Sequence, residues 1–255
     1  MPPDTLRGER SGGAGCGLFG KIPSKDDFLR RGLPMSFVAP WDAWLTRMMA
    51  TGAEPTDAAW TAAYLTSPPW RFALDPGLAG PQGWIGVVAS SLDRFGRAFP
   101  LTLAAPFARP LGILDLHEET RPFTDALEAM VLQVIEGALD VDVAAAGLPG
   151  LAARLLPPAA ENAVRRMTPE GASRADRTWV LTGRPLPSVG GAAADLLTWS
   201  LRAGAGGPVG LSCWWHEGWE GEPPTWLMTR GLPTPEMFLR MMDGRWSRAA
   251  GAECP

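Results

Sequence analysis

Residues 84–107 read WIGVVASSLDRFGRAFPLTLAAPF, two apolar runs separated by a short polar stretch. The first run, residues 84–89, is continuously apolar, which is typical of a buried strand. In the second run, residues 99–107, apolar side chains recur at every other position, the period of a strand. Ser, Asp and Gly residues between the runs indicate a turn. This stretch therefore predicts an antiparallel hairpin with a long loop.

The residues before the hairpin predict short strands and helices. Residues 18–23 resemble a short strand that ends at a proline. Residues 36–50 carry aromatic and aliphatic side chains at helical spacing, and a second short helix is expected after Pro55. The run at 70–74 has the character of a further strand.

The residues after the hairpin are more helical. An apolar stripe over residues 123–135 predicts a helix that ends near Gly137. Residues 141–156 predict another helix, interrupted by the Gly-Leu-Pro-Gly sequence at 147–150. The remaining expected elements are a loop over 157–177, strands over 179–182, 209–215 and 226–229, and helices over 196–202 and 235–242.

Strands and helices thus come in blocks rather than in alternation, which predicts an α+β fold with a mainly antiparallel sheet flanked by helices. We expect a single domain over residues 17–247, with a family core at 17–110 and a second half at 111–247. Residues 1–16 and 248–255 are expected to be tails, the first one disordered because it has little apolar surface to bury.

Composition excludes several classes of protein. The 255 residues carry a net charge of −4, which does not favour nucleic-acid binding. Three scattered cysteines, Cys16, Cys213 and Cys254, do not form a disulfide framework and fit a reducing cytosol. The sequence has neither an apolar run long enough to cross a membrane nor a signal peptide. We therefore expect a cytoplasmic protein without membrane insertion.

Two motifs resemble cofactor or metal sites but lack essential residues. The spacing from Gly15 to Lys21 matches a phosphate-binding P-loop, but Ile22 stands where Ser or Thr must hold Mg²⁺, and Pro23 disfavours the helix that must follow. His216-Glu217 begins like a zinc-protease motif without its second histidine. No cofactor, metal or small-molecule substrate is expected.

A hydrolase is the main enzymatic alternative. Cys213 or Ser212 would be its nucleophile, with His216 or Asp93 assisting. However, Cys213 lies in an apolar strand, where an inert thiol is expected. The sequence around Ser212 also lacks the final glycine of a nucleophile elbow. We therefore predict no enzymatic activity.

Two places are candidates for binding a partner protein. Neighbouring residues of a strand face opposite sides, so one of Trp214 and Trp215 can lie in the core while the other is either covered by a loop or exposed. An exposed tryptophan would be a good anchor for a partner protein. Asp93, Arg94 and Arg97 form a dense charge cluster on the expected turn. They form either an internal ion pair that shapes the hairpin or an arginine pair presented to an acidic or phosphorylated partner.

Several motifs in the first half resemble those of the TagF family, which typically has G-x-x-GKLPxxGDF, then RxLP and a WDxWL helix. The corresponding sequences here are GLFGKIPSKDDF (17–28), RGLP (31–34) and WDAWL (41–45), followed by WRFAL (70–74), WIGV (84–87) and SLDRFGRAFPL (91–101). One departure is Asp26, which stands where the family usually has glycine. The resemblance is strong over residues 17–107 and weaker around Trp214 and residues 226–238.

The resemblance implies a cytoplasmic accessory protein of the type VI secretion system. Such proteins are associated with post-translational repression of the apparatus, through its forkhead-associated scaffold protein. The family resemblance also implies a longin-like fold in the N-terminal part. Lys21 and Asp27 of the matched opening motif join the candidate partner-binding residues. A structural component of the secretion machine remains an alternative.

Overall fold

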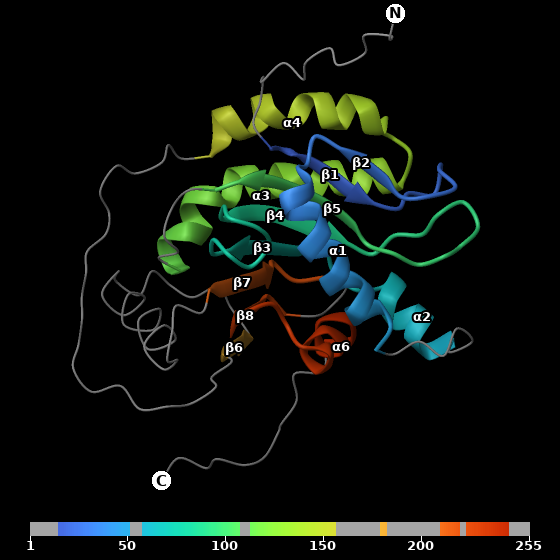
Figure 1. The fold of residues 1–255 in the computed structure, drawn as a ribbon. Coiled ribbons are helices and arrows are strands. Elements are labelled where there is room, and N and C mark those ends of the chain that lie inside the picture. Colours follow the sequence, from blue (N-terminus) through green and yellow to red (C-terminus); the bar gives the residue numbers. More distant parts are fainter. Residues whose placement is uncertain are drawn as a thin grey trace, which may run out of the picture.

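The computed structural model describes residues 15–51, 58–107, 113–156, 179–182, 210–219 and 223–244. Within these residues the chain forms one eight-stranded sheet in which every pairing is antiparallel (Figure 1). Its strands are β1 (Gly17–Gly20), β2 (Leu29–Arg31), β3 (Trp70–Leu74), β4 (Trp84–Ala89), β5 (Leu101–Pro106), β6 (Trp179–Thr182), β7 (Leu211–His216) and β8 (Thr225–Arg230). They lie side by side in the order β2-β1-β5-β4-β3-β7-β8-β6.

Helices cover both faces of the sheet, which confirms the predicted α+β class. The helices α3 (Ile113–Ile135) and α4 (Val141–Leu155) pack on one face and share its apolar core. On the other face lie α1 (Met35–Met49), α2 (Ala58–Leu65) and α6 (Pro235–Asp243). The longin-like assignment stays a prediction with which this topology is compatible. No helix among the described residues is long and apolar enough to cross a bilayer.

The central hairpin has the predicted form. β4 pairs with β5 from Trp84 opposite Pro106 to Ala89 opposite Leu101. Its apolar side chains divide between the two faces, with Ile85 toward α3 and Trp84 toward α1. The observed second strand begins two residues later than the apolar run, since Phe99 and Pro100 belong to the connection.

The prediction that one of Trp214 and Trp215 is exposed is wrong. The two rings do face opposite sides of β7, but helices cover both sides and neither ring has measurable exposure. Trp214 stacks on Trp41 of α1, with ring centroids 5.9 Å apart, and Trp215 stacks on Trp226 of β8 at 5.2 Å. Neither tryptophan is therefore available as a partner anchor.

The expected interruption of the helix at residues 147–150 is also wrong, because α4 runs through it. Its buried stripe, which packs on the sheet, consists of Val141, Ala144, Leu148 and Ala152. Packing of this stripe outweighs the low helix propensity of the glycines and of Pro149. The side chain of Asp140 caps the helix by accepting hydrogen bonds from two backbone N–H groups of the first turn.

Other differences are smaller. The helix α3 begins at Ile113, ten residues before the predicted stripe, and the short edge strand β2 has no sequence prediction. The strand predicted over 18–23 is seen at Gly17–Gly20. The loop predicted over 157–177 and the helix predicted over 196–202 lie outside the described residues. Strands β7 and β8, from the predicted second half, continue the sheet of the first half through the β3–β7 pairing.

Candidate functional site

A buried ion pair fixes the turn between β4 and β5. Lys21, which follows β1, donates from Nζ to Oδ2 of Asp93 over 3.0 Å. The Asp93 side chain has no exposed surface. Its Oδ1 accepts hydrogen bonds from the backbone N–H groups of Phe95 and Arg97, and its Oδ2 also accepts one from Arg97 Nε at 2.6 Å. One carboxylate therefore organises the whole turn, in which Gly96 adopts a left-handed conformation (φ 79°).

Asp93 is ionised in this arrangement. Burial acts to raise the pKa of its carboxyl group, but hydrogen bonds from Arg97 and Lys21, and from the Phe95 backbone, outweigh it. These donors hold the pKa of Asp93 well below its usual range. The turn is thus organised by a carboxylate that favours its ionised form and pairs with two cations, Lys21 and Arg97.

The outer side of the turn is tied to the connection between β1 and β2. Arg94 makes a two-pronged contact with the Asp26 carboxylate, Nε to Oδ1 and Nη2 to Oδ2, each at 2.7 Å. Arg97 Nη2 donates to the backbone oxygen of Asp26, and the Arg94 backbone N–H donates to the oxygen of Lys25. The two connections therefore form one surface, which we call the arginine turn: residues 25–28 and 93–97.

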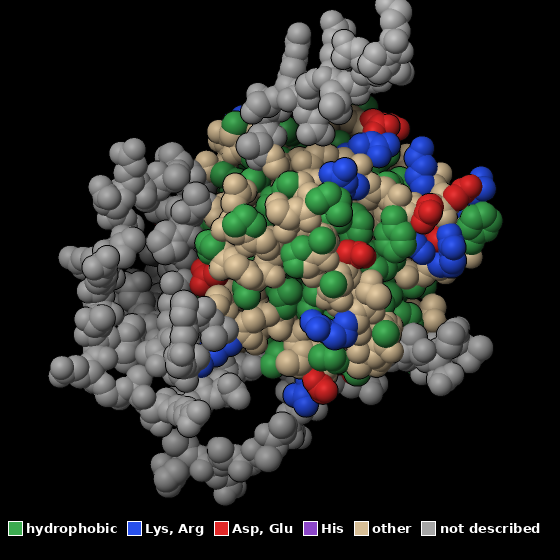
Figure 2. Space-filling view, in the orientation of Figure 1, with side chains coloured by type: hydrophobic (Ala, Val, Ile, Leu, Met, Phe, Trp, Pro, Cys, Tyr) green, Lys and Arg blue, Asp and Glu red, His purple; other side chains and the backbone are tan. Residues whose placement is uncertain are grey.

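Two aromatic rings lie on this surface. Phe95 is the most exposed large apolar side chain among the described residues, at 65%. The guanidinium groups of Arg94 and Arg97 lie 5.2 and 5.5 Å from its ring centre. Phe28 is 46% exposed and packs edge-on against Phe99. Figure 2 shows charged side chains gathered at the right-hand end of the molecule, where Figure 1 places these two connections.

The structure brings together most of the residues that the sequence nominated. Lys21, Asp93, Arg94 and Arg97 form one cluster, whose internal ion pairs agree with the first interpretation of the charged turn. Presentation of the arginines to a partner stays a prediction. Asp93 forms the internal ion pairs, while both arginine side chains remain 58% exposed. Asp27 lies on the same connection, exposed, with its carboxylate accepting a hydrogen bond from the Phe28 N–H.

Sequence reasoning missed three members of the arginine turn: Asp26 as the ligand of Arg94, and Phe28 and Phe95 as exposed rings. Asp26 and Arg94 are 68 residues apart, so no local pattern links them. The sequence does contain a signal for Phe95. An aromatic side chain in a polar turn, with Arg94 before it and Arg97 after it, does not fit the pattern of a core residue and is therefore expected at the surface.

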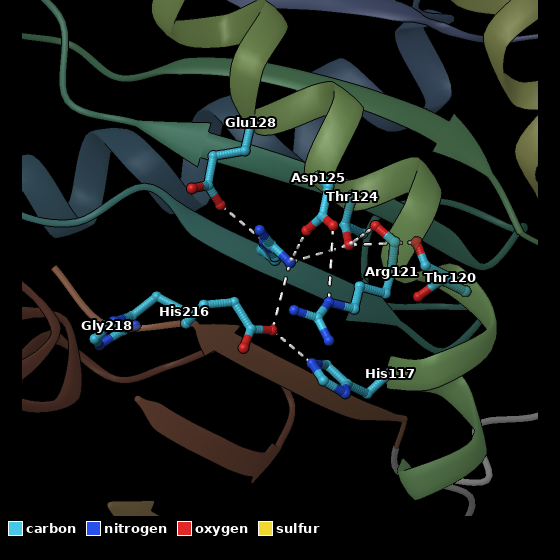
Figure 3. Close-up of polar contacts among 10 residues, drawn as sticks. His117, Thr120, Arg121, Thr124, Asp125, Glu128, His216 and Gly218 are labelled. Carbon is cyan, nitrogen blue, oxygen red and sulfur yellow. Dashed lines mark hydrogen bonds and ion pairs between the residues drawn. The ribbon is translucent and has the colours of Figure 1, made fainter. Parts of the chain in front are cut away.

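A second polar cluster surrounds Arg71 of β3, whose side chain is 4% exposed (Figure 3). Arg71 pairs with Asp125 at 2.7 Å and with Glu128 at 2.8 Å, both from α3. It also lies 3.5 Å from Glu217, whose carboxylate contacts His117 Nε2 at 2.5 Å. This network joins α3 to the residue after β7, so we interpret it as structural.

The electrostatics of this network favour an ionised Glu217. The hydrogen bond with His117 lowers the pKa of Glu217, and the charges of Arg71 and Arg121 lower it further. Burial acts on this pKa in the opposite direction, but its effect is smaller. The negative charge complements the buried Arg71 guanidinium.

The side chains proposed for the hydrolase alternative do not assemble. Burial raises the pKa of Cys213 to about 12, and its side chain faces α3 and α4. His216 lies three residues along the same strand and packs on Trp70, in the core of the opposite face. The Ser212 hydroxyl donates to the Gly231 oxygen and accepts from Trp214 Nε1. Neither nucleophile is therefore activated by His216.

The fold and the arginine turn define an α+β protein with one antiparallel sheet between two layers of helices. Residues 17–151 match the family described as TagF N-terminal domain, type VI secretion system-associated, and the chain belongs to this family. It is also similar to a solved structure, PA0076 from Pseudomonas aeruginosa PAO1, at 31% sequence identity and a TM-score of 0.65. That similarity covers 94% of this chain and 97% of the other. None of the curated proteins matches this chain.

Proposed function

We propose that this TagF-family protein is a non-enzymatic, cytoplasmic regulator that represses the type VI secretion system by binding its forkhead-associated scaffold protein. Family membership supports the secretion context. The observation that carries the binding mechanism is the exposed Phe95 ring, which lies beside the guanidinium groups of Arg94 and Arg97 on a turn that a buried ion pair orders.

This geometry suits protein recognition for two physical reasons. Aromatic and arginine side chains contribute most of the binding energy at many protein interfaces. A turn that is already ordered also loses little conformational entropy when a partner binds. The Lys21–Asp93 pair and the two backbone hydrogen bonds to Asp93 supply this order before any partner arrives.

Gene deletion with complementation tests this function. Deleting the gene should raise the amount of secreted type VI substrate, and the wild-type gene should lower it again. Phe95→Ser should fail to complement, whereas Val143→Ser should complement fully, because Val143 is similarly exposed (60%) but lies on α4. Unchanged secretion after deletion would contradict repression, and sedimentation with the assembled apparatus would instead indicate a structural component.

A further inference from the structure

We infer that Asp26 occupies the binding place of a carboxylate from an acidic segment of a partner protein, and that this segment binds Arg94 by displacing Asp26. The inference rests on the proposed function, because it identifies the chemistry of the partner at the arginine turn. Asp26 is then an internal competitor that lowers the affinity of the turn for its partner.

The contact between Arg94 and Asp26 has the geometry of carboxylate recognition. Both prongs of the guanidinium are used, with Nε on Oδ1 and Nη2 on Oδ2, each at 2.7 Å. Parallel contacts of this kind are the preferred way for arginine to hold a carboxylate. A carboxylate from another chain therefore fits the same two donors.

The contact is also exposed enough to exchange. The side chains of Arg94 and Asp26 are 58% and 55% exposed, so water screens both charges. Asp93 differs in each respect, since it is buried and accepts hydrogen bonds from four donor groups. Of the two carboxylates, Asp93 holds the turn and Asp26 is the replaceable one.

Charge and apolar surface indicate what replaces Asp26. Once Asp26 leaves Arg94, this guanidinium has no other ion pair in the arginine turn. The exposed charges of the turn are three cations, Lys25, Arg94 and Arg97, and two carboxylates, Asp26 and Asp27, because Asp93 is buried against Lys21. This small excess of exposed positive charge favours an acidic partner. The adjacent exposed Phe95 suits an apolar side chain. We therefore assign the part of the partner that replaces Asp26 to an acidic segment that also contains apolar residues.

Peptide binding to the purified full-length chain tests this assignment. The probe is a fluorescein-labelled peptide of alternating glutamate and leucine, with fluorescence anisotropy as the readout at low salt. Asp26→Asn should bind it about two- to sixfold more tightly than the wild type, because an exposed competing pair leaves Arg94 free only part of the time.

A matched control separates displacement from a change in net charge. Asp142→Asn makes the same charge change in another exposed arginine–aspartate pair, with Arg31 at 2.6 Å. Asp142→Asn should not reproduce the tighter peptide binding that is expected of Asp26→Asn. In an Arg94→Gln background, Asp26→Asn should have no larger effect than Asp142→Asn. Thermal melting of each variant near the wild-type temperature verifies that all are folded.

Three results would overturn the inference: equal affinities of Asp26→Asn and Asp142→Asn, a gain that persists without Arg94, or stronger binding of a phosphothreonine peptide of matched length and charge. This failure is distinguishable from failure of the proposed function. Repression and scaffold binding through Phe95 can hold while Asp26 does not compete, and the gene-deletion experiment measures that separately.

Discussion

At the scale of single residues, the four hydrogen bonds to the Asp93 carboxylate determine the shape of the candidate site. Asp93→Asn removes the negative charge but keeps the side-chain volume. Lys21 then becomes a buried cation without its ion pair, which is unfavourable. We expect Asp93→Asn to lower the melting temperature by several degrees, and Asp26→Asn to change it little. Equal melting temperatures for the two variants would show that the buried pair does not hold the turn.

The buried His216 gives a prediction for the pH dependence of stability. Burial lowers its pKa to about 4, with Glu217 opposing and Arg71 adding to the shift. The unfolded chain, with a histidine pKa near 6.5, therefore binds the proton first as the pH falls. The contribution of His216 therefore makes the free energy of unfolding fall as the pH drops from about 6.5 to about 4. At higher pH this contribution is constant.

His216→Asn should remove this effect. Urea unfolding at about pH 7.5 and about pH 5 should show that acidification costs the wild type about 1 to 2 kcal/mol more than the variant. An equal loss of stability in both proteins would mean that His216 is protonated in the folded state.

At the scale of elements, α4 shows where sequence patterns fail. The central hairpin and α1 were predictable, because alternating and helical periodicities identify buried strands and helices locally. The Gly-Leu-Pro-Gly sequence in α4 indicates a break locally, but the buried stripe along the helix needs continuity. Whether that packing compensates for the poor helix propensity of this segment depends on the sheet on which α4 packs. The sequence of α4 alone carries no information about that sheet.

Replacing Gly147 and Gly86 by alanine should change the stability of the protein in opposite directions. A Cβ atom at Gly147 meets nothing within 4 Å, so Gly147→Ala should stabilise the helix by about 0.5 to 1 kcal/mol. A Cβ atom at Gly86 would lie 2.4 Å from the Leu103 oxygen and 2.5 Å from Phe72 Cζ, so Gly86→Ala should destabilise by about 1 to 3 kcal/mol. Chemical denaturation measures both changes. Destabilisation by Gly147→Ala would contradict the continuous helix.

At the scale of the whole molecule, the candidate site was only partly predictable. Asp93, Arg94 and Arg97 are close in sequence, so their cluster is visible in the turn itself. Lys21 reaches Asp93 across 72 residues, and only the family motif nominated it. The burial of Trp214 and Trp215 follows from helices on both faces of the sheet, a property that neither residue's neighbourhood reveals.

The whole-molecule arrangement also explains why the arginine turn can act as a unit. Strands β1, β4 and β5 are held within one hydrogen-bonded sheet, with Lys21 following β1 and Asp93 in the connection from β4 to β5. A partner bound at Phe95 therefore contacts a surface supported by the core rather than a separate loop. This supports rigid docking on the turn, without a required change of fold.

Quantitative affinity capture with the forkhead-associated scaffold protein tests the central claim most directly. Tagged wild-type chain and Phe95→Ser, matched in melting temperature, are compared for the amount of scaffold that each recovers. We predict recovery with the wild type and a large loss with Phe95→Ser, because Phe95 is the most exposed apolar side chain of the arginine turn. Equal recovery by the two proteins, or no scaffold with either, would contradict the account.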